Sequence, residues 1–258
     1  MNFLNNLFTL KNKIAVVTGA ANGNGKSISE ALLRAGAKVI LVDINEKALL
    51  QTKNKLNRSN LKPLIFPCDI TNSDKLLELN DFVLHNFKQI DILVNNAGVT
   101  YGHKISDYPE KLWDKTYEVN LKAPFFLTKL FSRTMKKQKS GVIINITSIN
   151  AELAFPDNPA YVAFKGGLKQ LTKSLALDLG KYGIRVNNIG PGYIRTNMTK
   201  KSWLNKSRRK KIENKTILGR WGVPEDLTGL IILLSSDSSS YITGQDFYVD
   251  GGWLGKGL

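Results

Sequence analysis

Short apolar runs alternate with longer segments of helical periodicity along this chain. The segments Ser27 to Ala35 and Ser73 to Phe87 repeat apolar residues at the three- and four-residue spacing of an amphipathic helix. Seven near-continuous apolar runs indicate strands that are buried on both faces. They are KIAVVTG, AKVILVD, LKPLIFP, IDILVNN, GVIINIT, IRVNNIG and DFYVDGG. The alternation predicts one α/β domain over residues 1–258, a Rossmann-type, doubly wound parallel sheet of seven strands with helices on both faces.

Cysteine content and hydropathy bear on where the protein acts. Cys68 is the only cysteine, so no disulfide forms within the chain and a cytoplasmic location is expected. No segment approaches the roughly 18 consecutive apolar residues of a membrane span, so no membrane association is expected. The opening MNFLNNLFTLKNK lacks the charged and apolar regions of a secretory signal.

The chain is strongly basic, with 37 Lys and Arg against 21 Asp and Glu and a net charge of +16. This excess has two interpretations, an anionic macromolecule as partner or simply a lysine-rich composition. The basic residues are mostly scattered and accompany no nucleic-acid-binding module. We therefore expect a small-molecule substrate and no nucleic-acid partner.

The stretch VVTGAANGNGKSI, residues 16–28, predicts a phosphate-binding loop between a strand and a helix. A nucleoside triphosphate loop needs a glycine five residues before Gly25, but that position is Ala20. Gly19, Gly23 and Gly25 instead allow the sharp turn and the close backbone approach that the pyrophosphate of a dinucleotide requires.

Asp43 ends the second apolar run, 18 residues beyond Gly25, where a carboxylate can accept hydrogen bonds from the adenosine ribose. It would also repel a 2′-phosphate, and neither the following Ile44 and Asn45 nor Asn22 supplies a cation. NAD is therefore preferred over NADP. The alternative is an aspartate that only caps the next turn.

Tyr161 and Lys165 lie four residues apart at the start of a predicted helix and so share one face. A tyrosine titrates near 10, and a cation one turn away favours the phenolate. Ser148 precedes Tyr161 by 13 residues, and its hydroxyl can orient a substrate oxygen. These three residue types suit proton transfer to and from an alcohol.

With these motifs in place, residues 11–258 resemble a short-chain dehydrogenase/reductase. The resemblance rests on seven motifs in register: TGAANGNG at 18–25, CDI at 68–70, NNAG at 95–98, VNL at 119–121, Ser148, YVAFK at 161–165 and GPGYIRT at 190–196. It implies that Tyr161 is the general acid/base, that Lys165 lowers the tyrosine pKa and binds the nicotinamide ribose, and that Ser148 positions the substrate oxygen. Asn120 would hold a helix irregularity and a water of the proton relay.

The resemblance also implies a set of cofactor-binding residues. They are Gly19, Asn22, Gly23, Asn24, Gly25, Asp43, Ile44, Asp69, Ile70, Asn96, Ala97, Gly98, Tyr161, Lys165, Pro191, Gly192, Ile194 and Thr196. Taken singly, Asn96 and Gly98 could form a strand-end turn, Asn120 could lie on a helix surface and Ser148 could be an N-cap.

Two residues depart from the family pattern. Asn24 replaces an apolar residue between the last two glycines, and Phe164 replaces a small residue before the lysine. Phe164 could narrow the space behind the nicotinamide or pack at a subunit contact.

Substrate choice is assigned to Ser148, Asn150, Tyr161 and Tyr193, with Glu152 and His103 as further polar candidates. A lid is expected over about 197–220, and residues 1–10 form an N-terminal extension. Between Lys200 and Lys215 the lid carries eight basic residues against Glu213 alone. This basic segment could attract an anionic substrate, or it could be a solvated helix face.

The last forty residues resemble the sugar and sugar-acid dehydrogenases of the family, of the gluconate 5-dehydrogenase and 2-deoxygluconate 3-dehydrogenase kind. They resemble 3-oxoacyl-acyl-carrier-protein reductases, which use NADPH, less. We therefore expect NAD-dependent interconversion of a secondary alcohol and a ketone on a small polar substrate. A non-enzymatic NAD sensor or nucleic-acid-associated protein is the alternative class. The resemblance implies a homotetramer, and His85 and His103 have no metal-ligand spacing, so no metal is expected.

Overall fold

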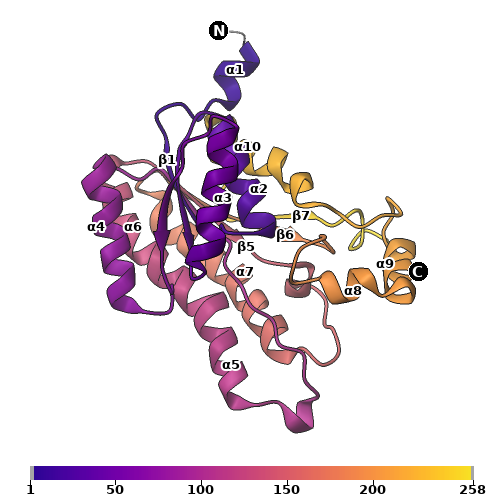
Figure 1. Ribbon diagram of the computed structural model, residues 1–258. Coiled ribbons are helices and arrows are strands. Elements are labelled where there is room, and N and C mark those ends of the chain that lie inside the picture. The colour runs from indigo at the N-terminus through magenta and orange to yellow at the C-terminus, as the bar shows by residue number, and fades with distance from the viewer. Residues whose placement is uncertain (1–2, 257–258) are drawn as a thin grey trace.

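A sheet of seven parallel strands forms the centre of the molecule in the computed structural model, which describes residues 3–256, with backbone only for residues 4–6 (Figure 1). The strand order is β3-β2-β1-β4-β5-β6-β7, and every neighbouring pair is parallel. The strands are β1 Ile14–Thr18, β2 Lys38–Asp43, β3 Leu64–Pro67, β4 Ile92–Asn95, β5 Gly141–Ile146, β6 Ile184–Pro191 and β7 Asp246–Val249. Six of them lie within the predicted runs and β6 extends its run by one residue, to Pro191, which confirms the predicted fold class.

Helices cover both faces of this sheet. One face carries α2 Gly23–Arg34, α3 Glu46–Arg58 and α10 Thr228–Ser235, and the other carries α4 Ser73–Phe87, α6 Ala123–Gln138 and α7 Pro159–Gly180. Along β1, Ala15 and Val17 belong to one hydrophobic cluster while Ile14 and Val16 belong to the other. This alternation explains why the strands read as continuous apolar runs.

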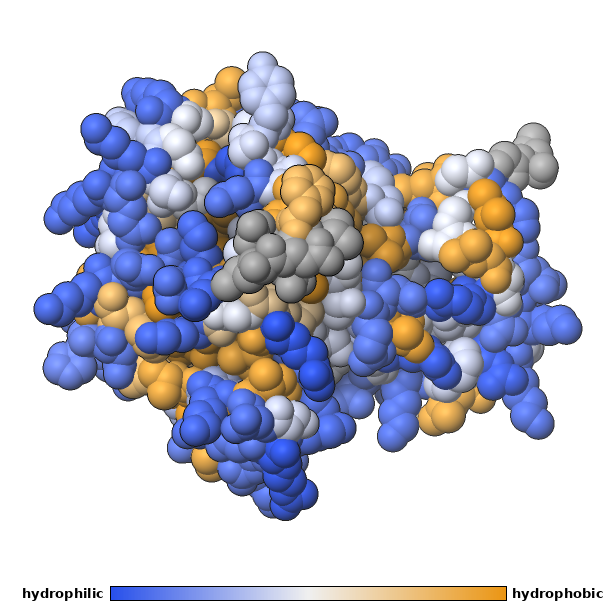
Figure 2. Space-filling view, turned by 90° about the horizontal axis from the view of Figure 1, so that it is seen from above, coloured by the Kyte–Doolittle hydropathy of each residue, from blue (hydrophilic) through white to orange (hydrophobic). Residues whose placement is uncertain are grey.

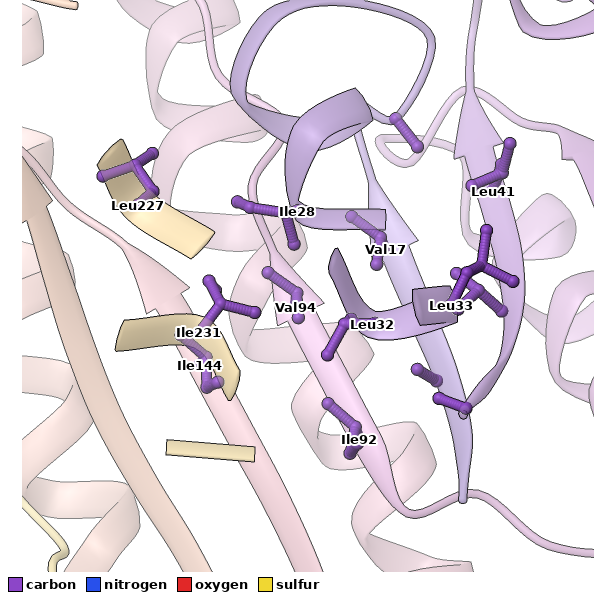
Figure 3. Close-up of a cluster of buried hydrophobic side chains, with 14 of the residues drawn as sticks. Val17, Ile28, Leu32, Leu33, Leu41, Ile92, Val94, Ile144, Leu227 and Ile231 are labelled. Atoms are coloured by element: carbon purple, nitrogen blue, oxygen red, sulfur yellow. The ribbon is translucent and has the colours of Figure 1, made fainter. Parts of the chain in front are cut away.

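The cluster on the first face is drawn in Figure 3, where side chains of α2 and α10 point toward those of four strands. The labelled residues are Val17, Ile28, Leu32, Leu33, Leu41, Ile92, Val94, Ile144, Leu227 and Ile231. This packing holds α2 directly above β1 and β4, so the start of α2 lies where the strand order reverses. Ligands of doubly wound sheets bind at that reversal.

The remaining elements are short or lie at the rim of the sheet. They are α1 Phe3–Phe8, η1 Ile105–Asp107, α5 Glu110–Tyr117, η2 Glu118–Lys122, η3 Ile149–Ala151, α8 Lys200–Leu204, α9 Lys206–Lys215, η4 Pro224–Leu227 and η5 Asp237–Ser239. Residues 1 and 2 of the predicted N-terminal extension lie outside the described residues, and the rest of that extension includes α1. In Figure 1, α8 and α9 project to the right.

Buried amide and hydroxyl groups form a hydrogen-bonded chain across the sheet. Asn95 Nδ2 donates to Asn145 Oδ1 at 2.8 Å, and Asn145 Nδ2 donates to Thr172 Oγ1 at 2.8 Å. Thr172 Oγ1 donates in turn to Asn188 Oδ1 at 2.6 Å, and Asn188 Nδ2 donates to Asp246 Oδ1 at 2.7 Å. These bonds join β4, β5, β6 and β7 to α7, so they fix α7 relative to the carboxyl ends of the strands.

Replacing Asn145 should therefore destabilise the protein. In Asn145→Ala the buried Asn95 amide loses its shorter hydrogen bond and keeps only that to Thr128 Oγ1 at 3.5 Å, and we expect the free energy of unfolding to fall by about 2–4 kcal/mol in urea denaturation. Asn54 is exposed on α3, and Asn54→Ala should change the free energy by less than about 0.5 kcal/mol. Equal effects of the two variants would show that the buried chain adds nothing to stability.

Candidate active site

A cavity of about 510 Å³ lies at the carboxyl ends of β4, β5 and β6. Many of the predicted site residues come together here, because members of the catalytic, cofactor-binding and substrate-binding sets all line this cavity. These are Asn24, Asn96, Gly98, Ser148, Asn150, Tyr161, Lys165, Pro191, Gly192, Tyr193, Ile194 and Thr196. Their segments are far apart in the chain and come together only because parallel strands end at one edge of the sheet.

The turn after β1 is held against β4 by one amide. Asn96 Nδ2 donates to the carbonyl oxygens of Thr18 at 2.9 Å and Gly19 at 3.1 Å. Gly19 has a φ of +63°, and a Cβ on Gly25 would lie 2.1 Å from the Gly19 oxygen. Glycine at both positions is therefore required by the turn itself, and Asn96 acts first as its structural tie.

Helix α2 begins at Gly23, directly beyond this turn. Asn22 is its N-cap, but the Asn22 side chain makes no capping hydrogen bond. Among the described residues, the Oδ1 atom of Asn24 is buried and has no hydrogen-bond partner. Free backbone N–H groups and an unsatisfied polar side chain at one helix start suit a bound polar ligand.

Asp43 lies at the end of β2, beside the glycine turn. Its carboxylate accepts hydrogen bonds from the backbone N–H of Ala21 and of Asn45, both at 3.0 Å. The turn-capping role considered for this residue is therefore present, and the carboxylate also fixes the loop against β2. Ile44, the next residue, is 67% exposed.

The segments after β3 and β4 complete this edge. Asp69 accepts hydrogen bonds from the backbone N–H and hydroxyl of Thr71, at 3.0 and 2.8 Å. Partial burial acts to raise the Asp69 pKa, but these bonds outweigh it, so the pKa lies below its usual range. Ile70 is buried, and the Ala97 backbone N–H donates to the Thr18 hydroxyl at 3.1 Å.

Asn120 lies in a π-helical turn, η2, between α5 and α6. It is buried, and its side chain binds both backbone groups of Val99: Oδ1 accepts from the N–H at 3.1 Å and Nδ2 donates to the carbonyl at 2.8 Å. A Cβ on Gly98 would lie 2.9 Å from Asn120 Oδ1. The expected helix irregularity is thus present. From this π-helical turn, the Asn120 side chain fixes the segment that follows β4.

Lys165 and Tyr161 project from the first turns of α7. The Lys165 side chain is 3% exposed, and Nζ donates to the Ile146 carbonyl at 2.6 Å, at the end of β5. Nζ lies 5.8 Å from the centroid of the Tyr161 ring. The cation is therefore held beside the phenol by a backbone group of the neighbouring strand.

Burial dominates the titration of both groups. It lowers the pKa of Lys165 to about 8, because the charged ammonium has lost solvent. It raises the pKa of Tyr161, while a hydrogen bond with Ser148 acts in the opposite direction. The Ser148 hydroxyl also accepts from the Asn150 N–H at 3.1 Å, so Ser148 caps η3 as well as lining the cavity.

Comparison with known proteins assigns this geometry to a family. A family model described as "Enoyl-(Acyl carrier protein) reductase" matches residues 19–254. The 2-dehydro-3-deoxy-D-gluconate 5-dehydrogenase of Bacillus subtilis is 38% identical, over 99% of this chain and 100% of its own length. The NAD-dependent glycerol dehydrogenase of Listeria innocua is 36% identical, over 96% of each chain.

A solved structure supports the same family assignment. The gluconate 5-dehydrogenase of Burkholderia cenocepacia, in complex with NADP and tartrate, superposes with a TM-score of 0.94 at 30% identity, covering 98% of this chain and 100% of its own. The chain is a short-chain dehydrogenase/reductase. It is an oxidoreductase that acts on CH–OH groups, and the comparisons support a pyridine nucleotide as its cofactor.

The glycine turn of this short-chain dehydrogenase/reductase fits such a cofactor. There is no space for a side chain at Gly25, the helix start is open, and the unpaired Asn24 oxygen lines the same cavity as Tyr161. The described residues hold no group of three or more His, Cys, Asp or Glu side chains that could ligate a metal. None of the helices in residues 3–256 combines the length and apolar character of a bilayer crossing.

Two polar candidates do not reach the cavity. Glu152 pairs with Lys169 and accepts a hydrogen bond from Tyr248, which lower its pKa and hold it at the edge of the sheet. His103 is exposed and lies edge-on to the Tyr108 ring, with 5.9 Å between the ring centroids. Neither of these two side chains lines the cavity, whereas Asn150 and Tyr193 do.

Phe164 packs on the outer side of α7 and does not line the cavity. Its ring centroid lies 4.9 Å from that of Trp113 and 5.5 Å from that of Tyr117, both on α5. Trp113 and Tyr117 are 40% and 41% exposed. Phe164 therefore does not narrow the space behind the nicotinamide, and it belongs to a partly exposed aromatic surface.

The structure adds residues that the sequence reasoning missed. Thr100 and Asn158 hydrogen-bond each other at 2.9 Å on the cavity wall, and Phe155 and Arg208 also line it. The sequence singled out the basic segment 200–215 as a whole. Only the fold distinguishes Arg208 from its basic neighbours, because position along a helix does not say what the helix packs against.

The buried Lys165 makes stability depend on pH. Its pKa is about 8 in the folded protein against 10.5 ordinarily, so between these values the unfolded chain binds more protons. The free energy of unfolding of wild type, relative to Lys165→Met, should therefore rise by about 2 kcal/mol from pH 8 to pH 10. Urea denaturation of the cofactor-free proteins measures it.

Lys210→Met provides the control, because Lys210 is exposed on α9. Its difference from wild type should stay constant over the same pH range. A constant difference for Lys165→Met as well would mean that the folded protein does not shift the titration of Lys165.

Proposed function

We propose that this enzyme interconverts a secondary alcohol and a ketone on a sugar acid, a sugar or a similar small polar molecule, with NAD(H) as cofactor. The observation that carries the proposal is that Tyr161, Ser148 and the buried Lys165 line one cavity together with polar groups of Asn150 and Tyr193. The sugar-acid and polyol dehydrogenases among the relatives support the substrate class.

In this proposal Tyr161 is the general acid/base. During oxidation its oxygen takes the proton of the substrate hydroxyl, which the Ser148 hydroxyl holds in place by a hydrogen bond. The Lys165 cation, 5.8 Å from the centroid of the Tyr161 ring, would favour the phenolate by its charge. When bound, the nicotinamide supplies the hydride acceptor. Asn120 maintains the π-helical turn, and we assign it to the proton relay.

The cofactor would lie along the carboxyl edge of the sheet. The start of α2 would bind the pyrophosphate, Asp43 the adenosine ribose, and Asp69 and Ile70 the adenine. Gly98, Pro191, Gly192, Ile194 and Thr196 would surround the nicotinamide half, and Lys165 would bind its ribose.

We propose a cytoplasmic homotetramer. Support for assembly comes from large apolar side chains left partly exposed: Phe125 and Phe126, at 38% and 41% exposure, line one surface groove together with Tyr117. The single cysteine, Cys68, is buried, which suits a reducing compartment. The segment 197–220, with α8 and α9, is proposed as the lid over the cavity.

A screen of NAD with aldonates, sugars, polyols and hydroxy acids, followed as NADH absorbance, tests the substrate class. Wild type should turn over at least one sugar, sugar acid or polyol. Tyr161→Phe should lower kcat by about 10²–10⁴-fold, because the proton acceptor is gone, while NADH affinity changes little. Residual kcat above a tenth would assign proton transfer to another group. Turnover only of acetoacetyl thioesters with NADPH would favour a 3-oxoacyl-acyl-carrier-protein reductase, and no turnover would favour an NAD sensor.

The choice of NAD rests on the Asp43 carboxylate. Wild type should bind NADH at least 10-fold more tightly than NADPH, because like charges at the 2′-position repel. Asp43→Asn should reduce this ratio severalfold in fluorescence titrations. Asp74→Asn, on the exposed start of α4, should leave the ratio unchanged. Equal wild-type affinities would contradict the assignment.

A further inference from the structure

The charged side chains that line the cavity are all basic. Its charged side chains, among the described residues, are Lys165 and Arg208, and no carboxylate lines it. Lys165 donates to the Ile146 carbonyl beside the reacting groups. Arg208 is therefore the cation that remains available to a ligand.

Arg208 occupies a place in α9 that helix stability does not favour. Its backbone N–H donates to the Asn205 side chain at 2.9 Å, so it lies in the first turn, where α9 has no acidic residue. The helix dipole disfavours a cation at this end. Lys206 and Arg209 lie in the same turn, but of these three cations only Arg208 lines the cavity.

The rest of α9 is anchored so that Arg208 faces the cavity. Ile212 is buried, and Trp221, 3% exposed, directs its indole N–H to the Arg209 carbonyl at 3.4 Å. The Arg209 guanidinium carbon lies 4.9 Å from the centroid of the Trp203 ring. These contacts hold one side of α9 against an aromatic wall.

The other basic residues of this helix do not reach the cavity. Lys206, Lys210, Lys211 and Lys215 are exposed and absent from its lining, whereas Arg208, although exposed as well, lines the cavity. Figure 2 shows hydrophilic side chains along the outer edge of the right-hand part of the molecule, where α9 lies in Figure 1. For these four lysines the solvated helix face is the correct reading of the basic segment.

No acidic partner neutralises Arg208 within the described part of the chain. The one acid of α9, Glu213, lies 3.7 Å from Arg209, and Asp226 pairs with Arg220 at 2.7 Å. The Arg208 cation lies close enough to Tyr193, which also lines the cavity, to act against the burial that raises the pKa of Tyr193. A guanidinium without an ion-pair partner keeps its N–H donors for a carboxylate.

We propose that Arg208 binds the carboxylate of the substrate, with Tyr193 as its neighbour, and so makes the enzyme specific for hydroxy acids over neutral polyols. This inference rests on the proposed function, because the carbinol must lie at Tyr161 and Ser148 while the carboxylate lies at Arg208. The planar fork of the guanidinium suits a bidentate contact, which a lysine can replace only in part, by its charge.

The experiment compares gluconate with gluconamide, its neutral counterpart, in wild type, Arg208→Gln, Arg208→Lys and Lys211→Gln. Steady-state kinetics with NAD give kcat and KM, and titration of the NADH complex gives the affinity for each probe without turnover. Lys211→Gln removes the same charge from the same helix at a position outside the cavity.

We expect Arg208→Gln to raise KM for gluconate at least 10-fold more than KM for gluconamide, with a smaller change in kcat. The affinity of the NADH complex for gluconate should fall in parallel. Arg208→Lys should recover part of the loss, and Lys211→Gln should change the gluconate KM by less than about twofold, because exposed charges act only at long range.

Equal effects of Arg208→Gln on the two probes, or equal effects of Arg208→Gln and Lys211→Gln on gluconate, would overturn the inference. Turnover of neutral sugars without any preference for gluconate would overturn it while leaving the proposed oxidation intact. Binding of gluconate that depends on Arg208, without turnover of any sugar or acid, would support the carboxylate site and refute the proposed oxidation. Absence of gluconate binding by wild type would overturn the carboxylate site.

Discussion

The hydrogen bonds of the Thr172 hydroxyl are the constraint on which the active site depends. This hydroxyl, completely buried, accepts from Asn145 on β5 and donates to Asn188 on β6. Thr172 follows Lys165 by seven residues, so the two share a face of α7. The hydrogen bonds of Thr172 therefore fix the position of Lys165 relative to the ends of β5 and β6. Because a buried amide without a partner is costly, the chain of bonds permits one register of α7 on the sheet.

The site also holds a positive charge, that of Lys165, at a buried position where the loss of solvent disfavours it. Lys165 is almost fully buried and has a backbone carbonyl, with no carboxylate, as its hydrogen-bond partner at 2.6 Å. The same burial that lowers the pKa of Lys165 raises that of Tyr161. The opposing effect on Tyr161 comes from its hydrogen bond with Ser148. A buried cation of this kind costs the fold stability, and in the proposed mechanism it favours the phenolate that accepts the proton.

The large positive charge of the protein acts mainly at its surface. The net charge is +16, yet the described cavity lining contains just two cations, Lys165 and Arg208. Packing of Ile212, Trp203 and Trp221 decides which side of α9 faces inward. Composition alone suggests an anionic partner of any size, whereas the fold leaves one arginine of the basic segment at the cavity, where we propose that it binds a carboxylate.

Much of the fold and of the candidate site was predictable from patterns of neighbouring residues along the chain. The seven strands, the glycine turn and the spacing of Tyr161 to Lys165 follow from periodicities of two and 3.6 residues and from backbone rules, which act over a few neighbouring residues. The motif order also sufficed to identify the family. Each of these features belongs to a single strand, helix or turn, so the sequence alone is enough to predict it.

The tertiary structure alone decided which side chains share the cavity. Glu152 is polar and four residues from Ser148, but Lys169 and Tyr248 hold it elsewhere, while Arg208 enters the cavity from 60 residues beyond Ser148. Phe164 stands beside Lys165 in sequence and turns to Trp113 and away from the site. The physical reason is that the partners of a side chain depend on which elements pack together. That packing is set by contacts between residues distant in the sequence, which no local pattern records.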